Sequence, residues 1–257
     1  MEVMEMMKIT GKTAVITGGN RGIGFNITEA FISAGYYVVV GARQELGLSE
    51  KFGENVKFIK TDVRNEDDHM KLVEAAVAKT GTLDVFVNNA GFSEWRPIDN
   101  IDNDFLDDIL ATNLKGAFWG CKAAASVMQE GANIINISSI AGKRGSLNNS
   151  AYVASKFGMN GLTQSLAKEL GSKGIRVNAL CPVLVPTDGL IEALKDPLSP
   201  AKGKPEEFIS NFTKANAALG RLPTGEEIAA MCVMLVSDNA SAITGQCMNV
   251  DCGVFPQ

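Results

Sequence analysis

Short apolar runs rich in β-branched residues alternate along the chain with longer segments whose apolar residues recur at helical spacing. The runs predict strands at 12–17, 36–41, 56–60, 83–88, 132–138, 175–181 and 246–250. The longer segments predict helices near 21–34, 44–52, 66–80, 101–128, 151–171 and 225–237. Such alternation is typical of a parallel sheet covered on both faces, so we expect an α/β fold with three layers and a seven-stranded parallel sheet.

One interval departs from this alternation. Residues 186–224 show little regular pattern and are rich in Pro, Lys, Ser and Gly around Asp196–Pro205. In a compact domain, an irregular segment of this length is usually a lid or a binding loop, although a plain surface loop is the alternative. Because no repeat or low-complexity linker divides the chain, we expect a single domain over 1–257, with a substrate-binding lid at about 186–224.

Composition excludes several classes of protein. The 257 residues can bury a large core, and no apolar run approaches the roughly 18 residues of a membrane span. A net charge of −5 and a pI near 5.1 argue against nucleic acid as a main partner. The first seven residues lack a basic start and a long apolar stretch, so we expect a loose tail, not a signal peptide. We therefore expect a cytoplasmic protein without membrane or nucleic-acid partners.

The cysteines and the single histidine do not indicate a metal site. The five cysteines lie mostly in apolar stretches and are expected to be small buried side chains in a reducing compartment. His69 lies in a charged helix start and has no Cys or His partner at ligand spacing. We expect no metal.

A glycine cluster follows the first predicted strand and opens the first predicted helix. Strand, glycine turn and helix together form the context that dinucleotide binding requires. The turn lets backbone approach a pyrophosphate, and the helix start presents free N–H groups and a positive dipole end. Since ordinary tight turns also use glycine, the prediction depends on this context.

Tyr152 and Lys156 are four residues apart on a predicted helix, so they lie on one face. A free tyrosine, with a pKa of about 10, is a poor acid or base at neutral pH. At about 4 Å and an effective dielectric near 20, an ammonium would favour the phenolate by roughly 4 kcal/mol, or about three pKa units before desolvation. We therefore expect Lys156 to bring the phenol near the working pH of an acid/base catalyst. This spacing is also common on ordinary helices.

The segment Thr17–Gly24 resembles the TGxxxGxG turn of short-chain dehydrogenases/reductases, and the resemblance covers about residues 8 to 253. It is carried by further matches in the family's order, which are Asp62-Val63, Asn88-Asn89-Ala90-Gly91, Asn113, Asn136-Ile137-Ser138-Ser139, Tyr152 with Lys156, and Val250-Asp251. The resemblance implies a Rossmann fold and an enzyme similar to the 3-oxoacyl-(acyl-carrier-protein) reductase branch.

The resemblance also implies roles for the candidate catalytic residues. Ser139 would hold the substrate oxygen, Tyr152 would exchange a proton with it, and Lys156 would bind the nicotinamide ribose. Asn113 would help to hold a water that continues the proton relay, or could be a polar helix residue satisfied locally. The thirteen-residue interval from Ser139 to Tyr152 matches the family, so Ser138 is given a structural role. Two hydroxyl donors would stabilise the charge that builds on a carbonyl oxygen during hydride transfer.

The cofactor is expected to be NADP(H), with NAD(H) less favoured. Where NAD-using relatives carry Asp after the second strand, this chain has Ala42, and the following Arg43 suits a phosphate. Arg21 is a second nearby cation, although Arg43 could simply solvate a loop. The implied cofactor-binding residues are Gly18, Asn20, Arg21, Gly22, Ile23, Gly24, Arg43, Asp62 (with the adenine amino group), Val63, Asn89, Ala90 and Gly91 (at the adenosine ribose), Tyr152, Lys156, Pro182, Val183, Val185 and Thr187.

The substrate is left open between several classes. Candidate pocket residues are Phe92, Trp95, Arg96, Arg144, Leu147, Asn148, Val183 and Leu184. Val183 and Cys252 stand where the family usually has glycine, which puts the acyl-carrier assignment in question. Thus 3-oxoacyl thioester reduction, sugar or polyol oxidation with or without a phosphate, broad carbonyl reduction and a catalytically idle nucleotide-binding regulator all stay open. Lysines at 195, 202 and 204 are interleaved with acidic residues, which favours a solvated surface over an anion site.

Two predicted helices carry more apolar residues than one buried face absorbs. They are Ala117, Phe118, Cys121, Ala124 and Ala125 on 101–128, and Phe157, Leu162, Leu166 and Leu170 on 151–171. A surplus of this kind is normally covered by a partner. The resemblance implies a two-fold four-helix contact in a homodimer or homotetramer; the alternative is that the sheet and neighbouring helices cover the surplus.

Overall fold

The computed structural model describes residues 11–256, so the expected N-terminal tail lies outside the described residues. The strands are β1 (Thr13–Thr17), β2 (Tyr37–Ala42), β3 (Val56–Lys60), β4 (Val85–Asn88), β5 (Asn133–Ile137), β6 (Arg176–Pro182) and β7 (Cys247–Val250). They form one 7-stranded sheet in the order β3-β2-β1-β4-β5-β6-β7, and every pairing is parallel. The predicted sheet is therefore confirmed.

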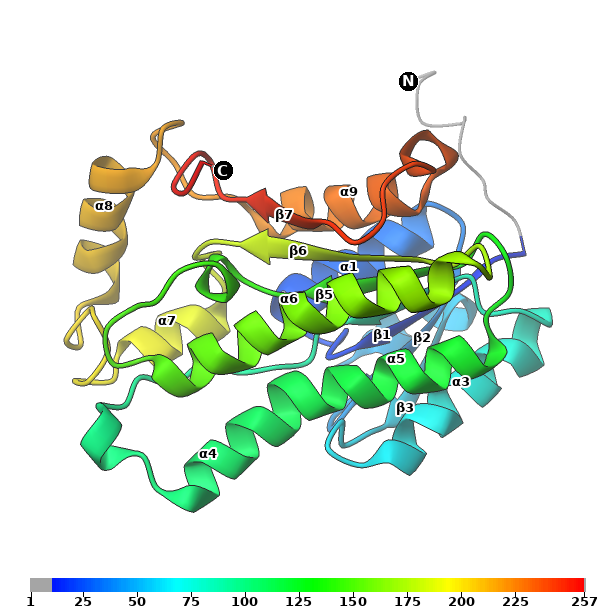
Figure 1. Cartoon of the computed structure of the whole chain (residues 1–257), viewed down its shortest axis with the longest axis horizontal. Coiled ribbons are helices and arrows are strands. Elements are labelled where there is room, and N and C mark those ends of the chain that lie inside the picture. The colour runs from blue at the N-terminus through cyan, green and yellow to red at the C-terminus, as the bar shows by residue number, and fades with distance from the viewer. Residues whose placement is uncertain (1–10, 257) are drawn as a thin grey trace.

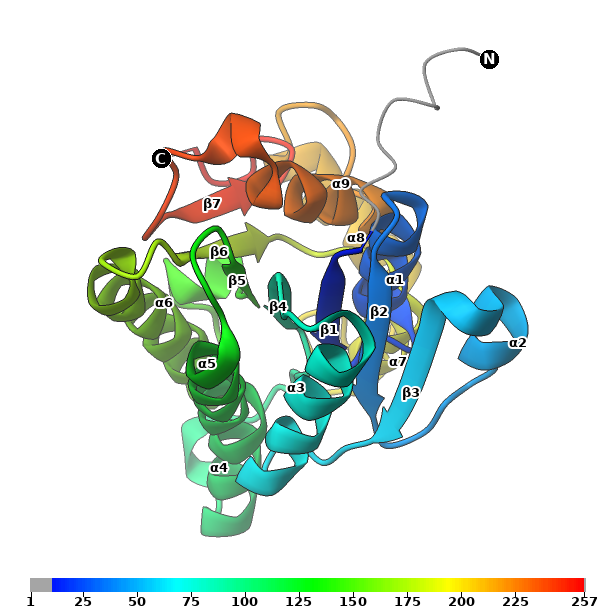
Figure 2. The same ribbon diagram turned by 90° about the vertical axis from the view of Figure 1, so that its right-hand side faces the viewer.

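Helices cover both faces of this sheet, as Figures 1 and 2 show. The α-helices are α1 (Gly22–Ser33), α2 (Leu48–Phe52), α3 (Glu66–Thr80), α4 (Asn103–Leu110), α5 (Gly116–Val127), α6 (Ser150–Gly171), α7 (Asp188–Leu194), α8 (Pro205–Asn216) and α9 (Gly225–Val236). One core cluster joins the sheet to α1 and α9, and another joins it to α3, α5 and α6.

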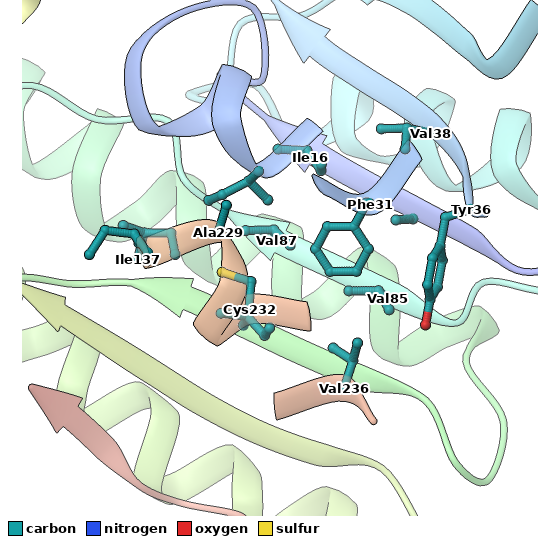
Figure 3. Packing of buried hydrophobic residues seen from close by; sticks show 14 of the residues in the cluster. Ile16, Phe31, Tyr36, Val38, Val85, Val87, Ile137, Ala229, Cys232 and Val236 are labelled. Atoms are coloured by element: carbon teal, nitrogen blue, oxygen red, sulfur yellow. The ribbon is translucent and has the colours of Figure 1, made fainter. Parts of the chain in front are cut away.

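Successive side chains of the buried strands point to opposite faces of the sheet and so enter the two core clusters in turn. Ile16 and Val38 contribute to the first cluster, which Figure 3 shows around Phe31 and Tyr36, whose rings meet edge to face at 5.0 Å. The neighbouring Val15 points to the opposite cluster. Burial on both faces explains why these strands read as continuous apolar runs. Chain order reverses between β1 and β4, and ligands of such sheets bind beyond the carboxyl ends of the strands at that point.

The helix predicted at 101–128 is interrupted. It consists of α4, a five-residue π-helical segment Ala111–Lys115, and α5. Short π segments inside α-helices are rare and often occur at functional sites. This one contains Asn113. The helix predicted at 44–52 is also shorter than expected, because only Leu48–Phe52 is helical and Gly47 before it adopts a left-handed φ of 77°.

The interval 186–224 contains α7 and α8, so the expectation of little regular structure there is wrong. Thr187 caps α7 by accepting a hydrogen bond of 3.3 Å from the Leu190 N–H. Pro205 opens α8, and two acidic residues follow it in the first turn. Figure 1 shows both helices at the end of the molecule toward which β6 and β7 point. Within residues 11–256 no helix is long and apolar enough to cross a membrane.

Candidate active site

The glycine turn joins β1 to α1 at the carboxyl edge of the sheet. Gly18 and Gly22 adopt left-handed φ values of 65° and 53°, which favour glycine. A Cβ at Gly24 would lie 2.1 Å from the Gly18 carbonyl oxygen, so a side chain there would distort the turn. The Gly18 N–H also donates to the Gly41 carbonyl at 2.7 Å, which ties the turn to β2.

Asn89 braces the turn from the neighbouring strand. Its side-chain amide donates to the carbonyl oxygens of Thr17, at 3.0 Å, and Gly18, at 3.1 Å. The Thr17 hydroxyl in turn accepts from the backbone N–H groups of Asn89 and Ala90. The Asn89 side chain is thus committed to the backbone of the turn, and the sequence analysis did not anticipate this role.

The start of α1 is open to an anion. Arg21 occupies the N-cap position without a side-chain cap, and the first turn carries no acidic residue. The free backbone N–H groups at the start of α1, and the positive end of the helix dipole, therefore have no acceptor or negative charge from the helix itself. Thr187 lies beside the same turn, because a Cβ on Gly22 would come within 3.5 Å of its methyl carbon. The loop after β6 and the glycine turn thus meet here.

Arg43 lies next to this turn on the loop after β2. The Asn20 side chain donates to the backbone carbonyl of Gln44 at 2.8 Å, which holds that loop against the turn. Arg21 and Arg43 are both exposed. Across the described part of the chain, neither guanidinium forms an ion pair. Both cations are therefore available to an external phosphate.

Asp62, the expected adenine-binding residue, is held by a partner that the sequence analysis missed. Arg64 donates to the Asp62 carboxylate through Nε at 2.9 Å and through a terminal nitrogen, and its other terminal nitrogen reaches Asp108 of α4 at 2.7 Å. The Arg64 guanidinium lowers the pKa of the Asp62 carboxyl. Val63 is buried, and its carbonyl contacts Nε2 of the buried His69 at 2.9 Å. The aspartate is thus kept ionised and oriented toward α4.

The three candidate catalytic side chains come together beyond β5 and β6. Ser139 follows β5 and accepts a hydrogen bond of 3.1 Å from the Ala141 N–H, which directs its hydroxyl toward the Pro182 carbonyl at 3.4 Å. Tyr152 and Lys156 project from the start of α6, with Nζ of Lys156 5.6 Å from the centre of the tyrosine ring. Nζ also donates to the Ile137 carbonyl at 2.8 Å.

The electrostatics of this pair differ from the expectation. Burial raises the pKa of Tyr152, and hydrogen bonding with the Ser139 hydroxyl offsets only part of that rise. Lys156 is 4% exposed, and burial lowers its pKa to about 8. Within the chain alone, the expectation that Lys156 brings the pKa of the phenol toward neutral pH is therefore wrong, because desolvation dominates and only the Ser139 hydroxyl acts against it. The phenol is protonated at neutral pH.

The side chains of Ser138 and Asn113 both form hydrogen bonds with backbone groups of nearby segments. The Ser138 hydroxyl donates to the Lys156 carbonyl at 3.4 Å, in keeping with the structural role predicted for it. Asn113 is fully buried; its amide accepts from the Phe92 N–H at 2.9 Å and donates to the Phe92 carbonyl at 2.8 Å. A third contact of 3.2 Å reaches the Ser155 hydroxyl. The Asn113 side chain thus anchors the loop after β4, and its relay role stays a prediction.

The candidate substrate residues surround this group from several segments. Phe92 and Tyr152 pack against the same cluster of Phe105, Ile109 and Ala151, and Trp95 packs on Leu194 of α7. Leu184 and Val183 pack with α8 and the C-terminal Val254, and Val185 is buried in the sheet core. The remaining candidates lie on the loops between these elements, and they are Arg96, Arg144, Leu147 and Asn148. Arg96 pairs with Glu94, and Arg144 stacks over the Phe255 ring, whereas Leu147 is exposed.

The structure shows the surroundings of Val183 and Cys252, the two residues that stand where the family usually has glycine. Cys252 adopts a left-handed φ of 53°, which explains why glycine is usual there. Val183 is buried against Ile140, next to Ser139.

All five cysteines are free, and three of them are buried. Over residues 11–256, no cluster of His, Cys, Asp and Glu side chains is arranged for a metal ion.

Comparisons with known proteins agree with this architecture. A family model described as enoyl-(acyl carrier protein) reductase matches residues 18–255. A 3-oxoacyl-(acyl-carrier-protein) reductase from Chlamydia muridarum is 38% identical over 96% of this chain and 98% of that protein. An L-2,3-butanediol dehydrogenase from Corynebacterium glutamicum is 35% identical over 95% of this chain and 98% of that protein.

Solved structures also resemble this chain over nearly its whole length. A short-chain dehydrogenase/reductase named glucose/ribitol dehydrogenase, from Brucella melitensis, superposes with a TM-score of 0.88 at 30% identity, covering 98% of this chain and 99% of that one. A variant of actinorhodin polyketide ketoreductase with NADPH gives a TM-score of 0.86 at 32% identity, covering 95% and 97% of the two chains.

Proposed function

Because the chain belongs to the short-chain dehydrogenase/reductase family, and is thus an NAD(P)-dependent oxidoreductase acting on CH–OH or C=O groups, we propose that it uses NADP(H) with Ser139, Tyr152 and Lys156 as its catalytic set. The observation that carries this proposal is the meeting of these three side chains beyond β5 and β6. They lie at the same edge of the sheet as the glycine turn.

The residues at the turn fit a dinucleotide. A Cβ at Gly24 would fill the space the turn needs, and the open start of α1 offers backbone N–H groups to a diphosphate. When bound, the nicotinamide supplies or takes up a hydride. Lys156, buried and bonded only to the Ile137 carbonyl among the described residues, retains donor capacity for a ribose hydroxyl. Asp62 would accept from the adenine amino group.

In the reducing direction, Tyr152 donates its proton to the carbonyl oxygen. The raised pKa keeps the phenol protonated at neutral pH, which suits a proton donor. Ser139 offers a second hydroxyl to the same oxygen as negative charge builds on it. Asn113 fixes the Phe92 loop beside the tyrosine and, as proposed, helps to hold the water through which the proton is replaced.

The preference for NADP(H) is supported by Arg43 and Arg21, two exposed cations beside the turn. We expect NADP(H) to bind at least tenfold more tightly than NAD(H), about 1.4 kcal/mol. Arg43→Ala should remove most of this preference, and Arg221→Ala, which alters an exposed arginine paired with Glu227, should leave it unchanged. Titration calorimetry with both cofactors measures the ratio. Equal affinities in the unmodified protein would contradict the assignment to Arg43.

The proposed substrate is a 3-oxoacyl group or another small carbonyl compound. A sugar or polyol is the second candidate, favoured by the relative named glucose/ribitol dehydrogenase. A panel of 3-oxo esters, ketones, sugars and polyols, followed by NADPH absorbance, distinguishes them. NADPH oxidation with a ketone or 3-oxo ester supports the proposal. Cofactor binding without turnover of any of these compounds would instead support an idle nucleotide-binding regulator.

We also propose that residues 186–224 close over the substrate and that two copies pair through α5 and α6. In the first case, α8 contributes Ile209 and Phe212 to a cluster with Ile140, next to Ser139. In the second case, Phe118 of α5 and Phe157 of α6 are 48% and 47% exposed, and Phe118 lines a hollow of about 490 Å³ together with Leu166 of α6. Large apolar side chains left in water favour a covered interface.

A further inference from the structure

Three exposed apolar side chains lie on segments that meet near the catalytic group. Leu147 is 86% exposed on the loop between Ser139 and Tyr152, Ile98 is 77% exposed on the loop after β4, and Leu198 is 41% exposed between α7 and α8. Single exposed apolar residues are ordinary, but here three of the exposed large apolar side chains come from three separate segments that contact one another. We call Ile98, Leu147 and Leu198 the apolar rim.

Asn148 holds the three segments of the rim together. Its carbonyl accepts a hydrogen bond of 2.7 Å from the Arg96 N–H, two residues before Ile98. Its side-chain amide makes a long contact of 3.5 Å with the Leu198 carbonyl. Asn148 adopts a left-handed φ of 56°, a conformation that asparagine tolerates better than most residues. The apolar rim is therefore fixed by specific contacts of a residue directly beside Leu147.

The rim is continuous with the site. Phe92, on the loop that carries Ile98, packs in one cluster with Tyr152. Trp95 of the same loop is buried against Leu194 and Ala201, on either side of Leu198. The loops that carry Ile98 and Leu198 thus also contribute apolar side chains to clusters beside the catalytic tyrosine and α7.

Carboxylates pair with three of the cations near the rim, whereas Lys143, Arg144 and Lys202 form no ion pair among the described residues. Arg96 pairs with Glu94 at 2.6 Å, Lys195 with Glu192 at 2.7 Å, and Lys204 with Glu207 at 3.3 Å. Four exposed carboxylates also follow Ile98 closely, at Asp99, Asp102, Asp104 and Asp107. These four carboxylates outnumber the three unpaired cations, so a phosphorylated or carboxylate-bearing substrate, or an acidic carrier protein, would meet net negative charge here, which disfavours association.

From this arrangement we propose that the substrate is an uncharged ketone with an extended apolar portion, taken up free and not on an acidic carrier. The carbonyl lies at Tyr152, and the apolar portion covers Ile98, Leu147 and Leu198. The assignment rests on the proposed function, because it requires that Tyr152 reduces a carbonyl. It selects among the substrate classes that the sequence leaves open.

The first test is a series of straight-chain methyl ketones of increasing length, each with a counterpart that carries a carboxylate at the far end. A methylene removed from water is worth about 0.8 kcal/mol, or about fourfold. We expect kcat/KM to rise about two- to fourfold per methylene until the rim is covered. The charged counterparts should fall at least about tenfold below the neutral ones. No dependence on length, or preference for the charged series, would overturn the assignment.

Substitutions in the apolar rim test whether this surface produces the dependence of kcat/KM on chain length. Leu147→Ser and Ile98→Ser should flatten the dependence of kcat/KM on chain length, so that long ketones lose most of their advantage over the shortest one. Leu46→Ser removes a leucine that is 56% exposed on the loop after β2 and serves as the matched control. If the rim variants keep the full dependence on length, the apolar portion binds elsewhere and the assignment fails.

A final comparison separates the proposal from its alternatives. The same 3-oxoacyl group is offered on an acidic carrier protein and as an N-acetylcysteamine thioester; a preference for the carrier of about tenfold or more would contradict free uptake. A lower mass of Leu147→Ser in light scattering would show that the rim is a contact between copies of this chain. Turnover of no ketone at all would overturn the proposed function itself, whereas turnover without dependence on length overturns only this inference.

Discussion

Lys156→Met should stabilise the protein while it removes activity. Lys156 is 4% exposed, and lowering its pKa from 10.5 to about 8 means that the charged form is disfavoured by about 3 kcal/mol in the folded state. Methionine has a similar length and no charge. The change also removes the hydrogen bond to the Ile137 carbonyl, which costs about 1 kcal/mol. We therefore expect a net gain of about 2 kcal/mol at pH 7.

The gain should depend on pH in a defined direction. Between about pH 8 and pH 10.5 the unfolded chain holds a proton on Lys156 that the folded chain has lost, so the free energy of unfolding of the unmodified protein rises with pH across this window. The advantage of Lys156→Met is therefore full below about pH 8 and shrinks as pH approaches 10.5.

Urea or thermal unfolding at neutral and alkaline pH measures this effect. For a chain of this size, 2 kcal/mol corresponds to a rise in Tm of about 4–8 °C. Lys168→Met, an exposed position on the same helix, is the control and should change little. NADPH at about one hundred times its Kd should add about 2.7 kcal/mol to the unmodified protein and much less to Lys156→Met. Equal or lower stability of Lys156→Met at pH 7 would refute the buried-charge reasoning.

Two further substitutions test the surroundings of the site. Arg64→Ala should weaken NADPH binding by no more than about fivefold with kcat unchanged, because an exposed ion pair is worth about 1 kcal/mol or less; Lys122→Ala, which breaks the exposed pair with Glu66, is the control in the same fluorescence titration. Phe118→Glu should reduce the assembly mass in light scattering, and an unmodified protein already at the 27.3 kDa of one chain would contradict the proposed pairing through α5 and α6.

The sheet was predictable because its strands are buried on both faces. Runs such as Thr13–Thr17 are wholly buried, so local composition and tertiary environment agree. The helical segments at 188–194 and 205–216 were not found, because their apolar residues face small clusters around Trp95 and Ile140 instead of one long core face. Capping by Thr187 and the Pro205 start were the available signals.

The sequence predicts which residues form the site better than it predicts their pKa values and contacts. The motif places Ser139, Tyr152 and Lys156, but the balance between burial and charge at the tyrosine depends on how deeply α6 sits. The contact of Arg64 with Asp108, which links Asp62 to α4, needed that helix to be placed, and the apolar rim needed three loops to be brought together. Such contacts join residues far apart in sequence, and no local pattern encodes them.

The most direct test of the account is the turnover of Tyr152→Phe, which removes the phenolic oxygen and its proton and leaves the ring packed against Phe105, Ile109 and Ala151. NADPH affinity should stay within about twofold of the unmodified protein. The rate of ketone reduction at saturating NADPH should fall at least about 10²-fold, the usual contribution of a general acid. Retention of more than about a tenth of the rate would show that Tyr152 is not the proton donor and would contradict the proposed mechanism.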